Sequence, residues 1–197
     1  MKNIIVVKRS GQREPLALEK WQTQIAKVCS GIADVSQSMV EIKAQPHFYD
    51  GITTQEIDEI TLRAIVNLID VEANPDIGHT NYQYVAGKQR LSMLRKDVYG
   101  SYEVPHLYDI VKKNVATGLY TSELLDWYSE ADWDKMNDML DHEKDEQYSY
   151  AAIEQLIEKY QSFDITSQHL LEYVRKTIKA LLERGDLDIA ALVRGKY

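Results

Sequence analysis

Three cationic side chains lie close together in the first twenty residues of the chain. Lys8 and Arg9 follow a β-branched run, and Lys20 stands where an amphipathic helix begins. The dipeptide Ser10-Gly11 between two short runs predicts a β-hairpin, which gathers the three cations where hairpin and helix meet. This junction suits a polyanion such as a nucleoside triphosphate. The alternative is that these are ordinary solvated charges, which are common at strand ends.

The elements expected to position these cations are mostly helices. Apolar residues recur at helical spacing, and helices are predicted over 18–30, 36–44 and 81–99, the last with Tyr84 and Val98 among its core residues. Thr53 with Glu56 three residues later predicts a capping box at the start of another helix. Residues 47–51 fit either a third strand or an extended connector. Residues 1–100 therefore read as a small β cap on four helices.

The remaining sequence is also helical in pattern and divides into two parts. Residues 101–160 are rich in tyrosine and contain several serines at positions suited to helix N-caps. Residues 161–197 contain a predicted amphipathic helix over 167–184. Its apolar stripe predicts self-association into a homo-oligomer or a partner that covers it, because an uncovered apolar face is a liability.

Composition and charge exclude several classes of protein. The chain has 197 residues, 44% of them hydrophobic, which is enough for a substantial core. No apolar run approaches the roughly 18 residues of a membrane span, and Lys8 and Arg9 interrupt the one apolar stretch near the N-terminus, which is unlike a signal peptide. A single cysteine, Cys29, excludes an internal disulfide framework. We predict a cytoplasmic protein that binds no membrane.

The net charge of −8 is unevenly distributed. Residues 1–100 are balanced, and nearly all of the acidic excess lies between Glu123 and Glu146. An acidic second half argues against nucleic-acid binding, which requires positive charge. The acidic run permits a basic protein partner, but such runs are more often a solvated helix face.

Residues for catalysis or for metal binding are missing from the pattern. Cys29 lies on an apolar helix face and is interpreted as a small core residue. The histidines are scattered without ligand spacing, so no metal site is predicted. Gly11 is isolated, which excludes a glycine-rich phosphate loop of the Walker type. No pair of carboxylates stands out for acid–base chemistry.

Six segments resemble a known family. VVKRSGQREPLALEKW resembles the opening of an ATP-cone, a regulatory nucleotide-binding domain. FYDGITTQEIDEI, NYQYVAG, LRKDVYG, PHLYDIV and SYAAIEQLIEKY are similar, in order over roughly residues 1–160, to the large (alpha) subunit of class I ribonucleoside-diphosphate reductase. The resemblance implies a mainly α (α+β) fold: a three-stranded β cap on a four-helix bundle, followed by further helices that in the family lead to a catalytic barrel. Residues 161–197 do not resemble the family.

The resemblance also implies a ligand and its site. In the family the cone binds ATP as activator and dATP as inhibitor, and we expect magnesium to accompany the nucleotide. Lys8, Arg9, Lys20 and Lys96 match groups around the phosphates, and Glu14 matches a residue near the base. The nucleotide-binding residues implied in this chain are Val7, Lys8, Arg9, Glu14, Lys20, Trp21, Thr54, Ile57, Asp58 and Lys96.

Three residues depart from the family pattern. Ala17 stands where some relatives have asparagine, Asp58 where a histidine can contact the nucleotide, and Ser92 where an aromatic ring can pack. Asp58 either repels phosphate or helps to hold a magnesium ion. These changes bear on affinity and on the choice between ATP and dATP.

The absence of redox cysteines limits the activity. Reduction of ribonucleotides in this family needs at least three cysteines, and the chain has one, so it is not expected to be an enzyme on its own. We predict an allosteric regulatory module that is one piece of a split reductase and binds a reductase catalytic chain or small subunit. The alternative is a free-standing interaction protein that binds a reductase subunit in trans without needing nucleotide. A truncated fragment is a third reading.

Overall fold

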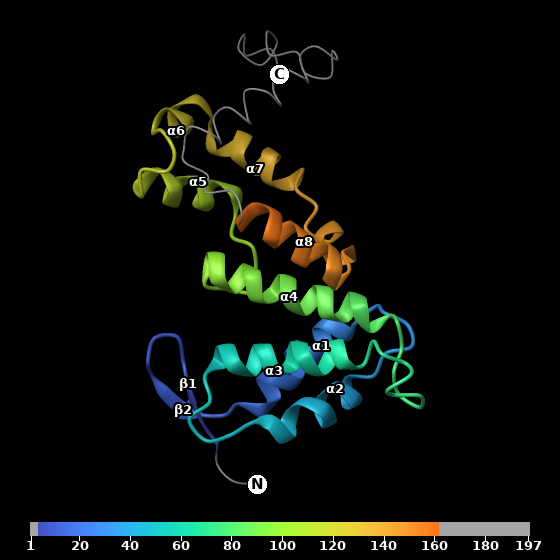
Figure 1. Cartoon of the computed structure of the whole chain (residues 1–197). Helices are drawn as coiled ribbons and strands as arrows, with labels where there is room; N and C mark the ends of the chain where they lie inside the picture. Colours follow the sequence, from blue (N-terminus) through green and yellow to red (C-terminus); the bar gives the residue numbers. More distant parts are fainter. Residues whose placement is uncertain (1–3, 162–197) are drawn as a thin grey trace. The chain divides into compact units, whose positions relative to one another are not determined.

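The computed structural model describes residues 4–161 and confirms a mainly helical fold (Figure 1). Its elements are β1 (Ile5–Val7), β2 (Arg13–Pro15), α1 (Leu18–Cys29), α2 (Gln37–Ala44), η1 (Gln45–His47), α3 (Thr54–Asn67), α4 (Tyr82–Tyr99), α5 (Leu107–Ala116), α6 (Glu123–Trp127), α7 (Glu130–Asp138), η2 (Lys144–Gln147) and α8 (Tyr150–Gln161), where η marks a 3₁₀ helix. The chain divides into two compact units after Gln155, and the first contains both strands and the helices α1 to α7. The helix predicted over 167–184, and the self-association predicted from it, lie outside the described residues.

The sheet of the described residues has two strands instead of the expected three. β1 and β2 pair antiparallel, and the N–H of Val7 also donates to the carbonyl of Ile52 (2.9 Å). Residues 50–53 thus run beside β1, but their pairing amounts to one parallel bridge between Val7 and Thr53. Thr53 is already the N-cap of α3, so the chain turns into a helix before a third strand can extend.

Four helices enclose the main core. α1 contacts α2, α2 contacts α3, α3 contacts α4, and α4 returns to α1. Each contributes a side chain with no exposed surface, namely Ile25, Val40, Ile65 and Val85. Burying each such side chain stabilises the fold by about 1.5–3 kcal/mol. This core fixes the faces of α1, α3 and α4 that the site uses.

Two residues expected in the core of α4 are instead exposed. Tyr84 is 38% and Val98 55% accessible. The buried stripe of this helix runs through Val85, Gln89 and Met93, and at 3.6 residues per turn Tyr84 and Val98 fall off that stripe. The stripe also contains a polar residue, Gln89, between Val85 and Met93. The apolar pattern alone did not indicate that this position is buried.

The segment from η2 to the start of α8 packs against α4. A Cβ atom at Gly87 would overlap the carbonyl oxygen of Tyr148, so only glycine allows the following backbone to lie this close. Lys88 and Arg95 of α4 form ion pairs with Glu146, at 3.5 and 3.6 Å. Part of the acidic run is therefore paired with α4 rather than wholly solvated. No helix of the described residues is long and apolar enough to cross a bilayer.

Replacing Thr53 with alanine is expected to lower the free energy of unfolding by about 1 kcal/mol. The capping box is present as predicted: the Thr53 hydroxyl accepts from the Glu56 N–H (3.1 Å), and the Glu56 carboxylate accepts from the Thr53 N–H (2.8 Å). Urea denaturation followed by circular dichroism measures the loss. Ser122→Ala is the control, because the Ser122 side chain makes no capping hydrogen bond. Equal losses in the two variants would contradict the prediction.

Candidate functional site

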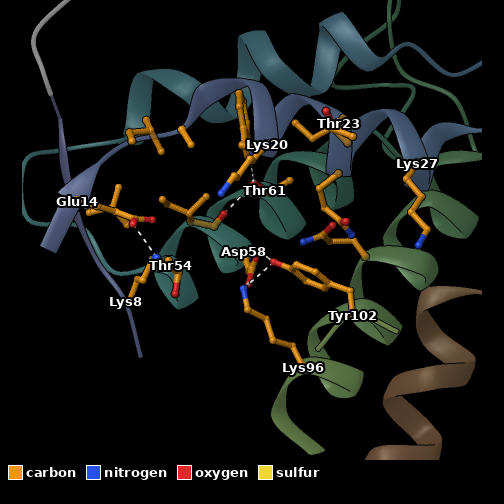
Figure 2. Close-up of a pocket in the computed structure, with 18 of the residues that line it drawn as sticks. Lys8, Glu14, Lys20, Thr23, Lys27, Thr54, Asp58, Thr61, Lys96 and Tyr102 are labelled. Atoms are coloured by element: carbon orange, nitrogen blue, oxygen red, sulfur yellow. Dashed lines mark hydrogen bonds and ion pairs between the residues drawn. The ribbon is translucent and has the colours of Figure 1, made fainter. Parts of the chain in front are cut away.

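A cavity of about 460 Å³ lies between the hairpin, α1, α3 and α4 (Figure 2). All but two of the residues predicted from the sequence line it: Lys8, Glu14, Lys20, Trp21, Thr54, Ile57, Asp58 and Lys96. They come from the hairpin and α1, which are adjacent in the sequence, and from α3 and α4, which lie further along the chain. The cavity is large enough for a small-molecule ligand, since such pockets usually measure about 300–1,000 Å³.

Helical spacing explains how α1 and α3 each present one polar face to the cavity. On α1, Lys20, Gln24 and Lys27 recur at intervals of four and three residues, while Trp21, Ile25 and Val28 of the same helix are buried. Residues three or four apart share one face of a helix. On α3, Thr54, Asp58 and Thr61 follow the same rule.

The hairpin supplies a half-exposed ion pair at the rim of the cavity. The ammonium of Lys8 lies 2.6 Å from the carboxylate of Glu14, across the turn between β1 and β2. Such an exposed pair contributes little to stability, about 0–1 kcal/mol. Lys8 can therefore exchange Glu14 for another anion at small cost.

Lys20 and Lys27 differ from Lys8 and Lys96, because their ammonium groups have no hydrogen bond or ion pair within the described part of the chain. Of these two, Lys20 lies nearer the hairpin. It extends from the first turn of α1 toward the side of the cavity formed by Thr54 and Asp58 (Figure 2). An unpaired ammonium at the wall of a cavity is free to accept an anionic group of a ligand. Ala17, the N-cap residue of α1, has no polar side chain that could bind the Lys20 ammonium in place of a ligand.

Asp58, Lys96 and Tyr102 form a hydrogen-bonded triad on the opposite wall. The Lys96 ammonium lies 2.6 Å from the Tyr102 hydroxyl and 3.3 Å from the Asp58 carboxylate, and the Tyr102 hydroxyl donates to Asp58 at 3.3 Å. The ammonium also lies 4.4 Å from the centre of the Tyr102 ring, close enough for a cation–π interaction. The triad joins α3, α4 and the connector that leads to α5.

The triad shifts the acid–base properties of its members. Asp58 is only 6% exposed, and burial raises its pKa, an effect that the nearby Lys96 only partly offsets. Burial acts to lower the pKa of Lys96, but the bonds to Tyr102 and Asp58 outweigh it and raise that pKa on balance. Lys96 therefore stays an ammonium, and its charge is shared with a carboxylate that burial makes easier to protonate.

Val7 and Arg9 lie outside the cavity, unlike the other predicted residues. Successive strand residues point to opposite faces, and it is Val6 that lines the cavity. The Arg9 guanidinium donates to the carbonyl of Lys96 (3.0 Å) and pairs with Asp97 (2.7 Å). Arg9 thus ties the hairpin to the C-terminal end of α4, where a cation is favoured by the helix dipole.

The sequence analysis missed several lining residues. Tyr102 gave no signal, because it lies in an irregular connector beyond the expected end of the domain. Gln24 and Gln89 did give one: each is a polar residue at a position where the helical stripe faces inward. Of the three departures from the family pattern, Ala17 and Asp58 line the cavity.

The segment that contains this cavity is similar to a known domain. Residues 4–97 match the family model described as the ATP cone domain. This segment is similar to an ATP cone domain. The domain contains the hairpin, the four core helices and every cavity residue except Tyr102.

Similarity extends beyond the ATP cone domain. The chain is 40% identical over 159 residues to the ribonucleoside-diphosphate reductase subunit alpha of Haemophilus influenzae, which covers 81% of this chain and 20% of that protein. It is 40% identical over 158 residues to the ribonucleoside-diphosphate reductase 1 subunit alpha of Escherichia coli K12, covering 80% and 20%. The corresponding subunit of Buchnera aphidicola subsp. Acyrthosiphon pisum is 40% identical over 159 residues, covering 81% and 20%. The chain thus spans about a fifth of the length of these relatives.

Cys29 is expected to react slowly with thiol reagents. Desolvation by burial raises its pKa to about 11, and the thiolate is the reactive form. At pH 8 its reaction with an aromatic disulfide reagent is expected to be on the order of a hundredfold slower in the folded protein than in urea. Comparable rates in the two states would contradict the core assignment of this side chain.

Proposed function

We propose that this chain is a non-catalytic regulatory module that binds ATP or dATP in the cavity of its ATP cone domain. The observation that carries the proposal is that the unpaired Lys20 ammonium lines the same cavity as Lys96. Phosphate oxygens are acceptors that pair with ammonium groups through charge-assisted hydrogen bonds. Lys8 at the rim would provide a third such group after it leaves Glu14.

Binding would require the triad to rearrange. A phosphate that takes the Lys96 ammonium must draw it away from Asp58 and Tyr102, which now hold it. Tyr102 belongs to the connector between α4 and α5, so its release would alter the start of the helices that follow the domain. A ligand shifts an equilibrium only by its differential affinity for two states. Exchange of partners at Lys96 provides such a difference.

A magnesium ion would arrive with the phosphates rather than at a preformed protein site. No group of three or more metal-ligating side chains is clustered in the part of the chain that the structure describes. Protein-bound Mg²⁺ is often held by one or two carboxylates together with phosphate oxygens. Asp58 is the carboxylate on the inner wall of the cavity that fits this role once Lys96 has moved, and the metal would then screen it from the phosphates.

The likeness to reductase alpha subunits suggests where such a module acts. We propose that it works with a separate reductase catalytic chain or small subunit and changes that partner's activity according to the nucleotide bound. The chain spans about a fifth of those relatives, and in this proposal catalysis belongs to the partner. Adding the purified chain to such a reductase, with and without dATP, tests this role.

A free-standing interaction protein that needs no nucleotide is the second candidate. The observation in its favour is that Glu14 and Asp58 already neutralise Lys8 and Lys96. On this reading the triad is a structural ion pair. The chain would then bind a reductase subunit equally well at zero and at millimolar ATP or dATP, and its melting temperature would not respond to nucleotide.

Lys20→Ala is expected to weaken ATP binding about tenfold or more, because hydrogen bonds to charged groups contribute about 1.5–3 kcal/mol. Arg9→Ala is expected to weaken it less than about threefold, since its guanidinium is bound to the end of α4 outside the cavity. Titration calorimetry with ATP and dATP measures both effects. Lys113→Ala on the exposed face of α5 is the control. Equal losses from Lys20→Ala and Arg9→Ala would show that this cavity does not hold the phosphates.

In magnesium-free buffer, where no metal replaces Lys96 as the counter-ion, ATP affinity is expected to rise as pH falls from neutral toward the raised pKa of Asp58. When phosphate removes the Lys96 charge, the buried carboxylate loses its counter-ion, and its pKa rises further above the usual range. Binding therefore takes up a proton, which lower pH favours. The Asp58→Asn variant should bind more tightly at neutral pH and lose this component of the pH dependence. Subtracting its profile from that of the natural chain cancels the titration of ATP itself, and identical profiles would refute the mechanism.

A further inference from the structure

The segment that contains α5, α6 and α7 (Figure 1) buries few apolar side chains and exposes many. Between residues 107 and 140 the buried apolar side chains are Val111 and Trp133. Large apolar side chains in the same segment are exposed at five positions, namely Leu119, Tyr120, Trp127, Met139 and Leu140. Single exposed apolar residues are normal, but several gathered in one segment mark an interaction surface.

Trp127, the last residue of α6, is the most unusual of these residues. It is 63% exposed, although tryptophan is highly buried on average. The residues that follow it are fixed in place. The ring of Tyr128 packs against that of Trp133, with 5.5 Å between the ring centres, and the Asp132 carboxylate accepts from the Ser129 N–H (3.1 Å) at the start of α7. Trp127 is therefore displayed on an ordered backbone, which reduces the entropy lost when a partner binds.

Acidic side chains without partners accompany Trp127. Glu123 lies four residues before it in α6 and so shares its helix face, while Asp126 precedes it directly and Glu130 begins α7. All three acids are exposed, and none forms an ion pair within residues 4–161. The α6 surface is defined here as the exposed residues Leu119, Tyr120, Glu123, Asp126, Trp127 and Glu130.

The charge of the α6 surface decides which kind of occupant can cover it. A second copy related by a two-fold axis would place the same acidic patch against itself, and like charges across an interface repel. Nucleic acids and the anionic lipids of membranes are negatively charged, so the same repulsion disfavours them. A protein surface that carries both apolar and basic side chains complements the α6 surface in both respects.

We propose that the α6 surface binds a protein segment in which arginine or lysine flanks apolar residues. The apolar side chains of that segment cover Trp127 and Leu119, and its basic side chains pair with Glu123 and Asp126 at the border of the contact. Protein interfaces commonly have an aromatic anchor at the centre and a polar, more exposed rim. The inference needs no bound nucleotide, so it would stand even if the cavity bound no ATP.

Three fluorescently labelled helical peptides are the probes, and fluorescence anisotropy measures their affinity for the full chain. The first peptide carries leucines flanked by arginines, the second has glutamate in place of arginine, and the third has glutamine in place of leucine. The first is expected to bind and the other two are not, because it alone matches both the charge and the apolar side chains. Failure of the first peptide to bind would overturn the proposal, and so would equal binding of the first and third.

Trp127→Ala is expected to weaken binding of the leucine–arginine peptide on the order of tenfold or more, as the loss of a central tryptophan does in other interfaces. Trp127→Phe should retain most of the affinity. Ile42→Ala is the matched control, because Ile42 is similarly exposed (61%) but belongs to α2. Circular dichroism should show unchanged folding, since all these side chains are exposed. Equal losses in the Trp127→Ala and Ile42→Ala variants would contradict the assignment of this surface.

The acidic residues are tested by the double variant Glu123→Gln with Asp126→Asn. It should weaken peptide binding about threefold to tenfold at low salt. The control is Glu72→Gln with Asp76→Asn, which removes two exposed acids after α3 and changes the net charge equally. Equal losses in the two double variants would show attraction by net charge alone. Sedimentation equilibrium of the chain without peptide tests the remaining occupant: a dimer that Trp127→Ala dissociates would replace the proposed partner with a second copy.

Discussion

The buried carboxylate of Asp58 constrains the arrangement of the whole site. A charge with so little exposure needs a counter-ion and hydrogen bonds in place, because its desolvation is otherwise too costly. Lys96 supplies the counter-ion, and both Lys96 and Tyr102 supply hydrogen bonds. Lys96 lies near the end of α4, and its backbone carbonyl accepts a hydrogen bond from Arg9 of the hairpin. Through this one interaction the hairpin, α3, α4 and the connector to α5 are brought to the same point. The cavity is the space enclosed where these elements meet.

The same ion pair shows how a chain with balanced charge in its first hundred residues would hold the polyanion that we propose as its ligand. Its cavity lysines are distributed so that Lys8 and Lys96 have partners that a phosphate would have to replace, while Lys20 and Lys27 have none among residues 4–161. An unpaired lysine offers attraction from the start, and the paired lysines make binding conditional on rearrangement. That conditional part is what distinguishes a sensor from a site that merely binds, since coupling requires a ligand to stabilise one of two arrangements.

The fold could be predicted from local signals wherever those signals were complete. The capping box at Thr53 and the apolar periodicity of α1 and α2 gave correct helices, because each depends on residues within one or two turns. The prediction of a third strand was wrong. Whether such a strand forms depends on how far the chain runs beside β1 before α3 begins, and that is a property of the tertiary structure. The cavity lining followed largely from the family resemblance. Tyr102 could not be found that way: its role depends on a connector folding back onto Lys96, and no short-range pattern encodes that contact.

The two faces of α4 suggest how the domain and the helices after it can influence each other. Its inner face presents Gln89 and Lys96 to the cavity, and its outer face presents Lys88 and Arg95 to the acid-rich segment around η2. Gly87 brings the backbone near Tyr148 into direct contact with the helix, so little space remains for either side to move alone. Packed interiors respond to a displacement by moving rigid elements rather than by deforming them. A shift of α4 that follows phosphate capture by Lys96 must therefore be accommodated in the ion pairs on its outer face. Those pairs join the cone to the part of the chain that resembles the reductase beyond it.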